Sequence, residues 1–170
     1  MSVAVYDDNI LFKSIENFFD DNGRHEKLLK LYKCKRLQPR LIDFFVTQMA
    51  KDEPQFFMLT VQGKTWGLCD VYTSYKNQLK AYHKKSFNLF DKRKIVMVKD
   101  NPYPLSKLNV YKWLIQHDIY KIIYNNIHNI QKKYYEYRKK CCTKKKIIKR
   151  GKMKTFINNP VIIKIDSVKF

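Results

Sequence analysis

A lysine-rich stretch near the carboxyl end, residues 131–154, sets the strongest limit on how this 170-residue chain can fold. Of its 24 residues 12 are cationic, and Glu136 is its only acid. Residues 101–170 carry 17 basic and 3 acidic side chains, whereas residues 1–100 carry 18 and 12. Like charges at this density repel one another and destabilise a compact state. The stretch is therefore expected to bind a polyanionic partner.

Outside this stretch the sequence has the composition and the periodicity of a folded protein. Hydrophobic residues make up 45% of the chain and aromatic residues 15%, which excludes disorder of the whole chain. Apolar residues at helical spacing predict helices at 7–20, 26–35, 39–51, 70–85 and 106–137, the last with a break near 117–118. β-branched and aromatic runs predict strands at 55–61, 65–68, 95–98, 155–157 and 161–165. The expected fold class is α+β, a mostly helical single domain with short β hairpins and a basic C-terminal helix or segment.

Capping and breaking residues predict where these elements begin and end. Asp70 and Ser106 are expected to cap the helices that follow them. Asn22-Gly23 is a stop signal for the first helix, and Pro102 and Pro104 predict a break in regular structure.

Charge and periodicity together predict four parts along the chain. An acidic, helical N-terminal segment covers 1–39 and an α+β core covers 40–130. The cationic segment covers 131–154, and a C-terminal β segment at 155–170 is expected to pack on the core.

The sequence holds no pattern typical of a catalytic or metal site. The four glycines are too far apart for a phosphate-binding loop, and no nucleophile elbow occurs. The cysteines, at 34, 69, 141 and 142, lack zinc spacing and are expected to be free thiols. We therefore expect no enzyme, no cofactor and no metal. The alternative is a magnesium-dependent nuclease that would use the acids Asp43, Asp52, Glu53 and Asp70.

The cationic side chains are the expected binding site for nucleic acid. Lysine outnumbers arginine 29 to 6, which favours contact with phosphates over readout of base edges. The site residues expected in the cationic segment are Lys132, Lys133, Arg138, Lys139, Lys140, Lys144, Lys145, Lys146, Lys149, Arg150, Lys152 and Lys154. A second group at helical spacing is Lys76, Lys80, Lys84 and Lys85. A solvated tail, a nuclear-import signal and an anionic membrane surface stay open as alternatives.

Tyrosines lie among the cations in both groups, where they could stack on bases. Tyr72, Tyr75 and Tyr82 share one helical face and are expected to be core or rim residues. Tyr134, Tyr135 and Tyr137 occupy three of four positions, so at least one of them is expected to be exposed.

Three blocks carry a resemblance to a known family. RLIDFFVTQMAK at 40–51 resembles a helix with the pattern Leu-Arg-x-Leu-Asp-Trp-Phe-Val-Thr-x-Tyr-x-Lys, with Phe44 and Met49 in place of Trp and Tyr. VYTSYKNQLKAYHKKSFNLFDKRK at 71–94 resembles a second block, with Asn88-Leu89 in place of Asp-Pro. KLNVYKWLIQHDIYKII at 107–123 resembles the third. In this order the blocks are similar to an uncharacterised protein family of large nucleocytoplasmic DNA viruses.

The resemblance implies a viral origin but supplies no activity. Together with the charge it leads us to expect a non-enzymatic viral protein that binds nucleic acid largely without sequence preference, DNA in preference to RNA. The lack of an apolar run long enough to cross a bilayer and of a signal pattern predicts a soluble intracellular protein, in the cytoplasm or nucleus of the infected cell or in the virion. The alternative is a virion-assembly or interaction protein with viral partners, whose basic segment serves import or packing.

Overall fold

The computed structural model describes residues 8–61 and 64–154 of the chain. It divides into a first compact unit that ends at Lys133 and a second unit that begins at Tyr134. The expected strands at 155–157 and 161–165, and their packing on the core, lie outside the described residues.

The first unit begins with two helices that pack on each other and on α6 (Leu105–Gln116). α1 (Asp8–Asp20) buries the predicted apolar positions Leu11, Ile15 and Phe19. α2 (Asn22–Lys33) follows at once, because the Asp21 carboxylate accepts a hydrogen bond from the backbone N–H of Gly23 at 2.8 Å. Asn22-Gly23 therefore marks the end of α1 as predicted, but it also opens α2.

The helical segment after Pro39 contains an irregular turn. It runs through α3 (Pro39–Phe44), a π-helical turn η1 (Phe45–Met49) and α4 (Ala50–Asp52). β1 (Phe56–Val61) then pairs antiparallel with β2 (Lys64–Asp70), as the aromatic and β-branched run predicts.

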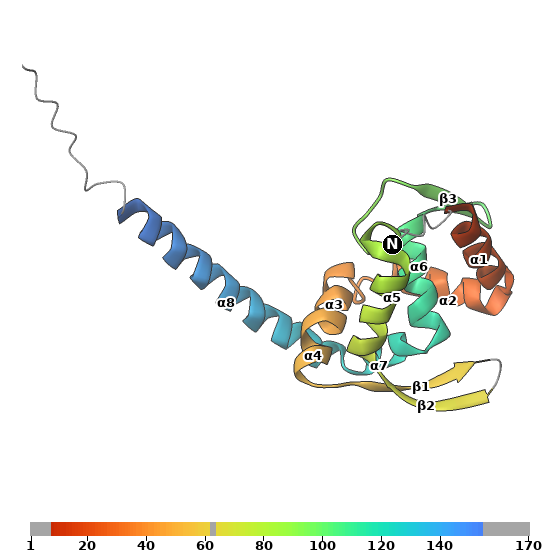
Figure 1. Cartoon of the computed structure of the whole chain (residues 1–170), viewed down its shortest axis with the longest axis horizontal. Helices are drawn as coiled ribbons and strands as arrows, with labels where there is room; N and C mark the ends of the chain where they lie inside the picture. The colour runs from red at the N-terminus through yellow and green to blue at the C-terminus, as the bar shows by residue number, and fades with distance from the viewer. Residues whose placement is uncertain (1–7, 62–63, 155–170) are drawn as a thin grey trace, which may run out of the picture. The chain divides into compact units, whose positions relative to one another are not determined.

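Asp70 is the N-cap of α5 (Val71–Ser86), and its carboxylate accepts the backbone N–H of Thr73 at 2.8 Å. This cap and the helix that follows it were both predicted correctly from the sequence. In Figure 1 α5 lies beside α6, against which it packs.

A second hairpin was only half predicted. β3 (Ile95–Val98) is present, but it pairs with β4 (Asn101–Pro104), where the two prolines predicted a break. In a two-stranded sheet each strand has one free edge, and a proline is tolerated where its nitrogen points to that edge. Pro102 and Pro104 stand two residues apart and so take equivalent positions in the ladder. The turn residues Lys99 and Asp100 have φ of 44° and 61°, which suits a tight hairpin.

The long helical pattern after residue 105 is divided twice. The expected break occurs at Asp118, whose φ is 51°, and α7 (Ile119–Asn125) follows. A second break at Asn126 separates α7 from α8 (Ile127–Lys154). The predicted cap Ser106 is wrong, because α6 begins at Leu105 and the Ser106 hydroxyl instead donates to the Asp91 carbonyl at 3.4 Å.

α6 is the centre of the core. Nine of its 12 residues are buried, and in the core the indole N–H of Trp113 donates to the Ser74 hydroxyl of α5 at 3.0 Å. Tyr111 of α6 and the large side chains Phe19, Phe45 and Phe87 around this helix are almost fully buried. Over the described residues the fold is thus the predicted one: α+β, mostly helical, with two small antiparallel hairpins.

Candidate functional site

The start of α8 belongs to the first unit. Ile127 and Ile130 are buried, and the Lys133 ammonium donates to the Glu53 carboxylate. Lys133 is therefore already paired in the folded protein, whereas Lys132 is exposed. Of these two predicted site residues, only Lys132 has an exposed side chain without an ion pair in the described structure.

In the second unit, side chains of α8 are described as far as Cys142, and all six residues at 135–140 are exposed. They include the predicted site residues Arg138, Lys139 and Lys140. The exposed rings of Tyr135 and Tyr137 confirm that at least one tyrosine of this group faces solvent. The Arg138 guanidinium lies 5.9 Å from the centre of the Tyr134 ring, so an aromatic face and a cation are adjacent here.

The backbone of α8 stays helical to Lys154. It therefore includes the remaining predicted cations, whose side chains lie outside the described part: Lys144, Lys145, Lys146, Lys149, Arg150, Lys152 and Lys154.

The second predicted group lies on α5, where Lys76, Lys80, Lys84 and Lys85 are all exposed. The lysines predicted at helical spacing do not all line one surface: Lys76 and Lys84 line the same cleft, whereas Lys80 does not. His83 leaves the helical conformation, with φ of 55° and ψ of 161°, and this kink ends the four-residue repeat before Lys84. The tyrosines meet the expectation of core or rim positions: Tyr75 packs on Phe87 and Trp113, and Tyr82 stacks on Phe87.

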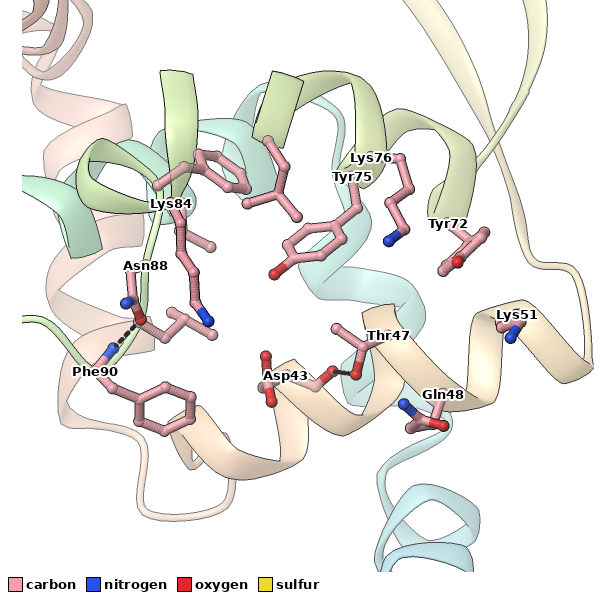
Figure 2. Close-up of a pocket in the computed structure, with 14 residues that line it drawn as sticks. Asp43, Thr47, Gln48, Lys51, Tyr72, Tyr75, Lys76, Lys84, Asn88 and Phe90 are labelled. Carbon is pink, nitrogen blue, oxygen red and sulfur yellow. Dashed lines mark hydrogen bonds between the residues drawn. The ribbon is translucent and has the colours of Figure 1, made fainter. Parts of the chain in front are cut away.

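The kink places Lys84 in a cleft that the sequence did not predict. The cleft has a volume of about 600 Å³ and separates α3, η1 and α4 from α5 and the residues that follow α5 (Figure 2). Three lysines line it, Lys51, Lys76 and Lys84. The amides of Gln48 and Asn88 line it as well. Its polar groups are therefore mostly hydrogen-bond donors and cations.

Asp43 is the acidic exception in this cleft. Figure 2 shows its carboxyl group facing the hydroxyl of Tyr75 and the ammonium of Lys84. No other described residue forms a hydrogen bond with this carboxyl group; the bond from the Thr47 hydroxyl, at 2.6 Å, goes to the Asp43 backbone carbonyl instead. Burial raises the pKa of Asp43, and the Lys84 ammonium opposes that rise. A half-buried carboxyl group in a cleft, with its pKa raised by burial and a cation opposite it, is typical of a functional site.

The π-turn explains why these residues meet. A π-turn adds one residue to a helical turn, and such turns are frequent at functional sites. Here it lies between Asp43 and Lys51, and Asp43, Thr47, Gln48 and Lys51 all line the cleft. The sequence signal that could have indicated it is the polar set Asp43, Thr47, Gln48 within an otherwise buried helical segment.

The four acids of the nuclease alternative have different surroundings. Glu53 pairs with Lys133, Asp70 caps α5, Asp43 faces the cleft, and Asp52 is exposed. Within 8–61 and 64–154 no cluster of three or more His, Cys, Asp or Glu side chains has the arrangement of a metal site. Over the same residues, no helix has the length and apolarity to cross a bilayer.

The sequence matches the family of unknown function DUF7197 over residues 3–164, and the chain therefore belongs to this family. No curated protein and no solved structure matches it.

Proposed function

We propose that this protein binds nucleic acid, largely without sequence preference, through the cationic part of α8, and that it has no enzymatic activity. The observation that supports the proposal is that 12 cations and a single acid at 131–154 belong to one continuous helix. At a rise of 1.5 Å per residue these 24 residues span about 36 Å, close to one turn of duplex DNA at about 34 Å. The helix thus carries about one cation per 3 Å over the length of one duplex turn.

The chemistry of these cations favours phosphate contact. A duplex carries about one negative charge per 1.7 Å of axis, and each neutralised phosphate releases counterions. Lysine is a mobile point charge without the planar fork with which arginine reads guanine. We expect about six phosphates to be engaged, which corresponds to a slope of log K against log salt near −5.

The test compares two variants with the same change in net charge. The first replaces five cations of α8 with glutamine, Lys144, Lys145, Lys146, Lys149 and Arg150. The control replaces five exposed lysines near the N-terminus, Lys13, Lys27, Lys30, Lys33 and Lys35. Fluorescence anisotropy with a labelled duplex at several salt concentrations should show a much shallower slope for the first variant and little change for the control. Equal losses would mean that net charge alone attracts the duplex, and an unchanged slope in the first variant would place binding elsewhere, such as Lys76, Lys80, Lys84 and Lys85.

A second candidate is the assembly or interaction protein, and the β1–β2 hairpin favours it. Phe56, Met58, Trp66 and Leu68 are all exposed, Trp66 and Leu68 to 72%. Met58 and Leu68 are directly paired across the two strands, so they lie on one face of the hairpin. A pull-down from nuclease-treated lysate with the wild-type chain and with Leu68→Ser separates the candidates. If a protein stays bound after nuclease treatment and is no longer captured by Leu68→Ser, the result favours assembly. If the captured proteins disappear after nuclease treatment, the result favours nucleic-acid binding.

The viral origin stays part of the proposal. It is supported by the three blocks at 40–51, 71–94 and 107–123, whose order and residues resemble the family of large DNA viruses.

A further inference from the structure

We propose that the cleft around Asp43 is a nucleotide-binding site, in which the Asp43 carboxylate accepts the N–H groups of a guanine base and the lysines of the cleft contact its phosphate. The site belongs to the first unit and does not depend on the cationic part of α8. It therefore goes beyond the proposed function, since the cations of α8 do not distinguish bases.

The size and composition of the cleft suit a nucleotide. Its volume of about 600 Å³ lies within the range of about 300–1,000 Å³ that is usual for small-molecule sites. Lys51, Lys76 and Lys84 line it, and Figure 2 shows the ammonium groups of Lys76 and Lys84 turned into it. Three cations against one carboxylate attract an anion, and a phosphate is the anion that a nucleotide carries.

Aromatic side chains supply the surface for a base. Phe90 lines the cleft and is nevertheless 51% exposed, so one ring edge or face is open to a ligand. Tyr72 lies on the other side, with the Lys76 ammonium 5.5 Å from its ring centre. An aromatic side chain beside a phosphate-binding lysine is a typical arrangement for stacking a base.

Asp43 determines which base fits. A carboxylate accepts hydrogen bonds and donates none. Guanine presents two adjacent N–H donors on its pairing edge, at N1 and N2, which match the two carboxylate oxygens. Adenine and cytosine place an acceptor beside their amino group, and that acceptor would face a carboxylate oxygen. Because the carboxyl group of Asp43 has no hydrogen-bond partner among the described residues, it is available for this contact.

Two sources could supply such a nucleotide, a free nucleotide or a guanosine within a single strand. The experiment therefore has two arms, both with the full chain. Calorimetry measures binding of GMP, AMP, CMP and UMP. Anisotropy compares a ten-residue oligothymidine with one that carries a single guanosine.

We expect GMP to bind at least about tenfold more tightly than the other nucleotides, in line with the discrimination of one bidentate contact. If the source is a strand, the guanosine-containing oligonucleotide should show the preference and GMP should bind weakly. Asp43→Asn should abolish the preference for guanine, because an amide places a donor where the carboxylate accepts. Lys84→Gln should weaken all nucleotides alike.

Matched controls lie nearby on the same elements. Asp52→Asn removes an exposed carboxylate of α4 that does not line the cleft, and Lys80→Gln removes an exposed ammonium of α5 that does not line it either. Both should leave the preference unchanged. Since Lys84 is exposed, Lys84→Gln tests the site even if Asp43→Asn were to disturb folding.

The absence of a guanine preference in both arms overturns the proposal, as does a preference that survives Asp43→Asn. Failure of the proposed function gives a different result. The salt dependence of duplex binding would then persist after the cations of α8 are replaced, and the guanine preference of the cleft would be unaffected.

Discussion

The helix α6 in the first unit and the part of α8 in the second unit are stabilised in different ways. Nine of the 12 residues of α6 are buried, so packing holds it in place. In α8 all six residues at 135–140 are exposed, and no face of the helix is buried there. A helix without tertiary burial depends on local interactions and on its surroundings. The comparison teaches that the fold and the main charge are separable, so that the cationic residues can serve binding without disturbing the core.

The variant with the largest expected effect on this separation is Trp113→Ala in the core. Loss of a buried tryptophan should lower the free energy of unfolding by about 3–5 kcal/mol. Urea unfolding monitored by tyrosine fluorescence measures the change. Ser74→Ala is the milder companion: it removes the acceptor of the buried indole N–H and should cost about 1–3 kcal/mol.

Neither change should alter the salt dependence of duplex binding under conditions where the variant is still folded. A shallower slope in folded Trp113→Ala would show that the two regions are not separable.

The next test concerns the charge of α8. In four pairs of cations the two members are four residues apart in the sequence: Lys140 and Lys144, Lys145 and Lys149, Lys146 and Arg150, and Arg150 and Lys154. Each like-charged pair at this spacing costs a helix about 0.2–0.5 kcal/mol, so together they cost about 1–2 kcal/mol. A polyanion should relieve this repulsion, and far-ultraviolet circular dichroism should show more helix when heparin is added.

The variant with five glutamines at 144–150 should show little increase, because glutamine is a good helix former without charge. An equal increase in that variant would contradict the electrostatic explanation.

A smaller effect is expected from pH in the first unit. The His117 ring packs against Phe57 at 5.0 Å, and its Nδ1 is buried without a hydrogen-bond partner in the described structure. Burial lowers the pKa of His117, so the unfolded chain takes up its proton first, near pH 6.5. The free energy of unfolding should therefore fall as the pH drops below about 6.5, until the folded protein also takes up the proton.

Urea unfolding at a series of pH values measures this decline. Burial also lowers the pKa of His25, with a contribution from Lys99, so this second histidine should act in the same direction. His117→Phe should flatten part of the decline, and a profile identical to that of the wild type would exclude His117 as a source.

The smallest expected effect is the change in the free energy of unfolding when Asp43 is replaced. Because burial raises the pKa of Asp43, the folded state binds its proton more tightly than the unfolded state. The charged carboxylate thus lowers stability at pH 7, and Asp43→Asn should raise the free energy of unfolding by up to about 0.5 kcal/mol. The gain should shrink as the pH falls from the pKa of the folded state to that of the unfolded chain, below which the wild-type carboxyl group is neutral in both states.

Asp52→Asn should show no such gain, because its carboxylate is exposed. If Asp43→Asn instead destabilised the protein, the carboxyl group would contribute to the stability of the first unit.

The sequence was sufficient for most of the helices and the first hairpin, because these follow from local rules. Apolar positions such as Leu11 and Ile15 recur at helical spacing, and Asp70 has the side chain that a helix N-cap needs. β4 was missed because Pro102 and Pro104 are strand breakers in general, and only the pairing partner shows that their nitrogens face a free edge. The break at Asn126 was missed because the apolar spacing continues across it.

The cleft could not be predicted because its residues come from segments far apart in the chain. Asp43 and Lys51 lie on either side of a π-turn, and Lys84 follows directly after His83, which leaves the helical conformation. The polar set Asp43, Thr47 and Gln48 is a local signal for the π-turn, but the cleft itself forms only where these segments pack on α5.

The sequence by itself determined that this chain forms a mostly helical α+β fold and carries a dense band of positive charge at 131–154. Both are local properties, set by the spacing and the type of neighbouring residues. Only the tertiary structure decided that Lys133 is paired with Glu53 and that Asp43 faces Lys84 across a cleft. The physical reason is that an ion pair or a cleft requires groups from distant segments to come within a few ångströms, and packing of the core alone brings them there.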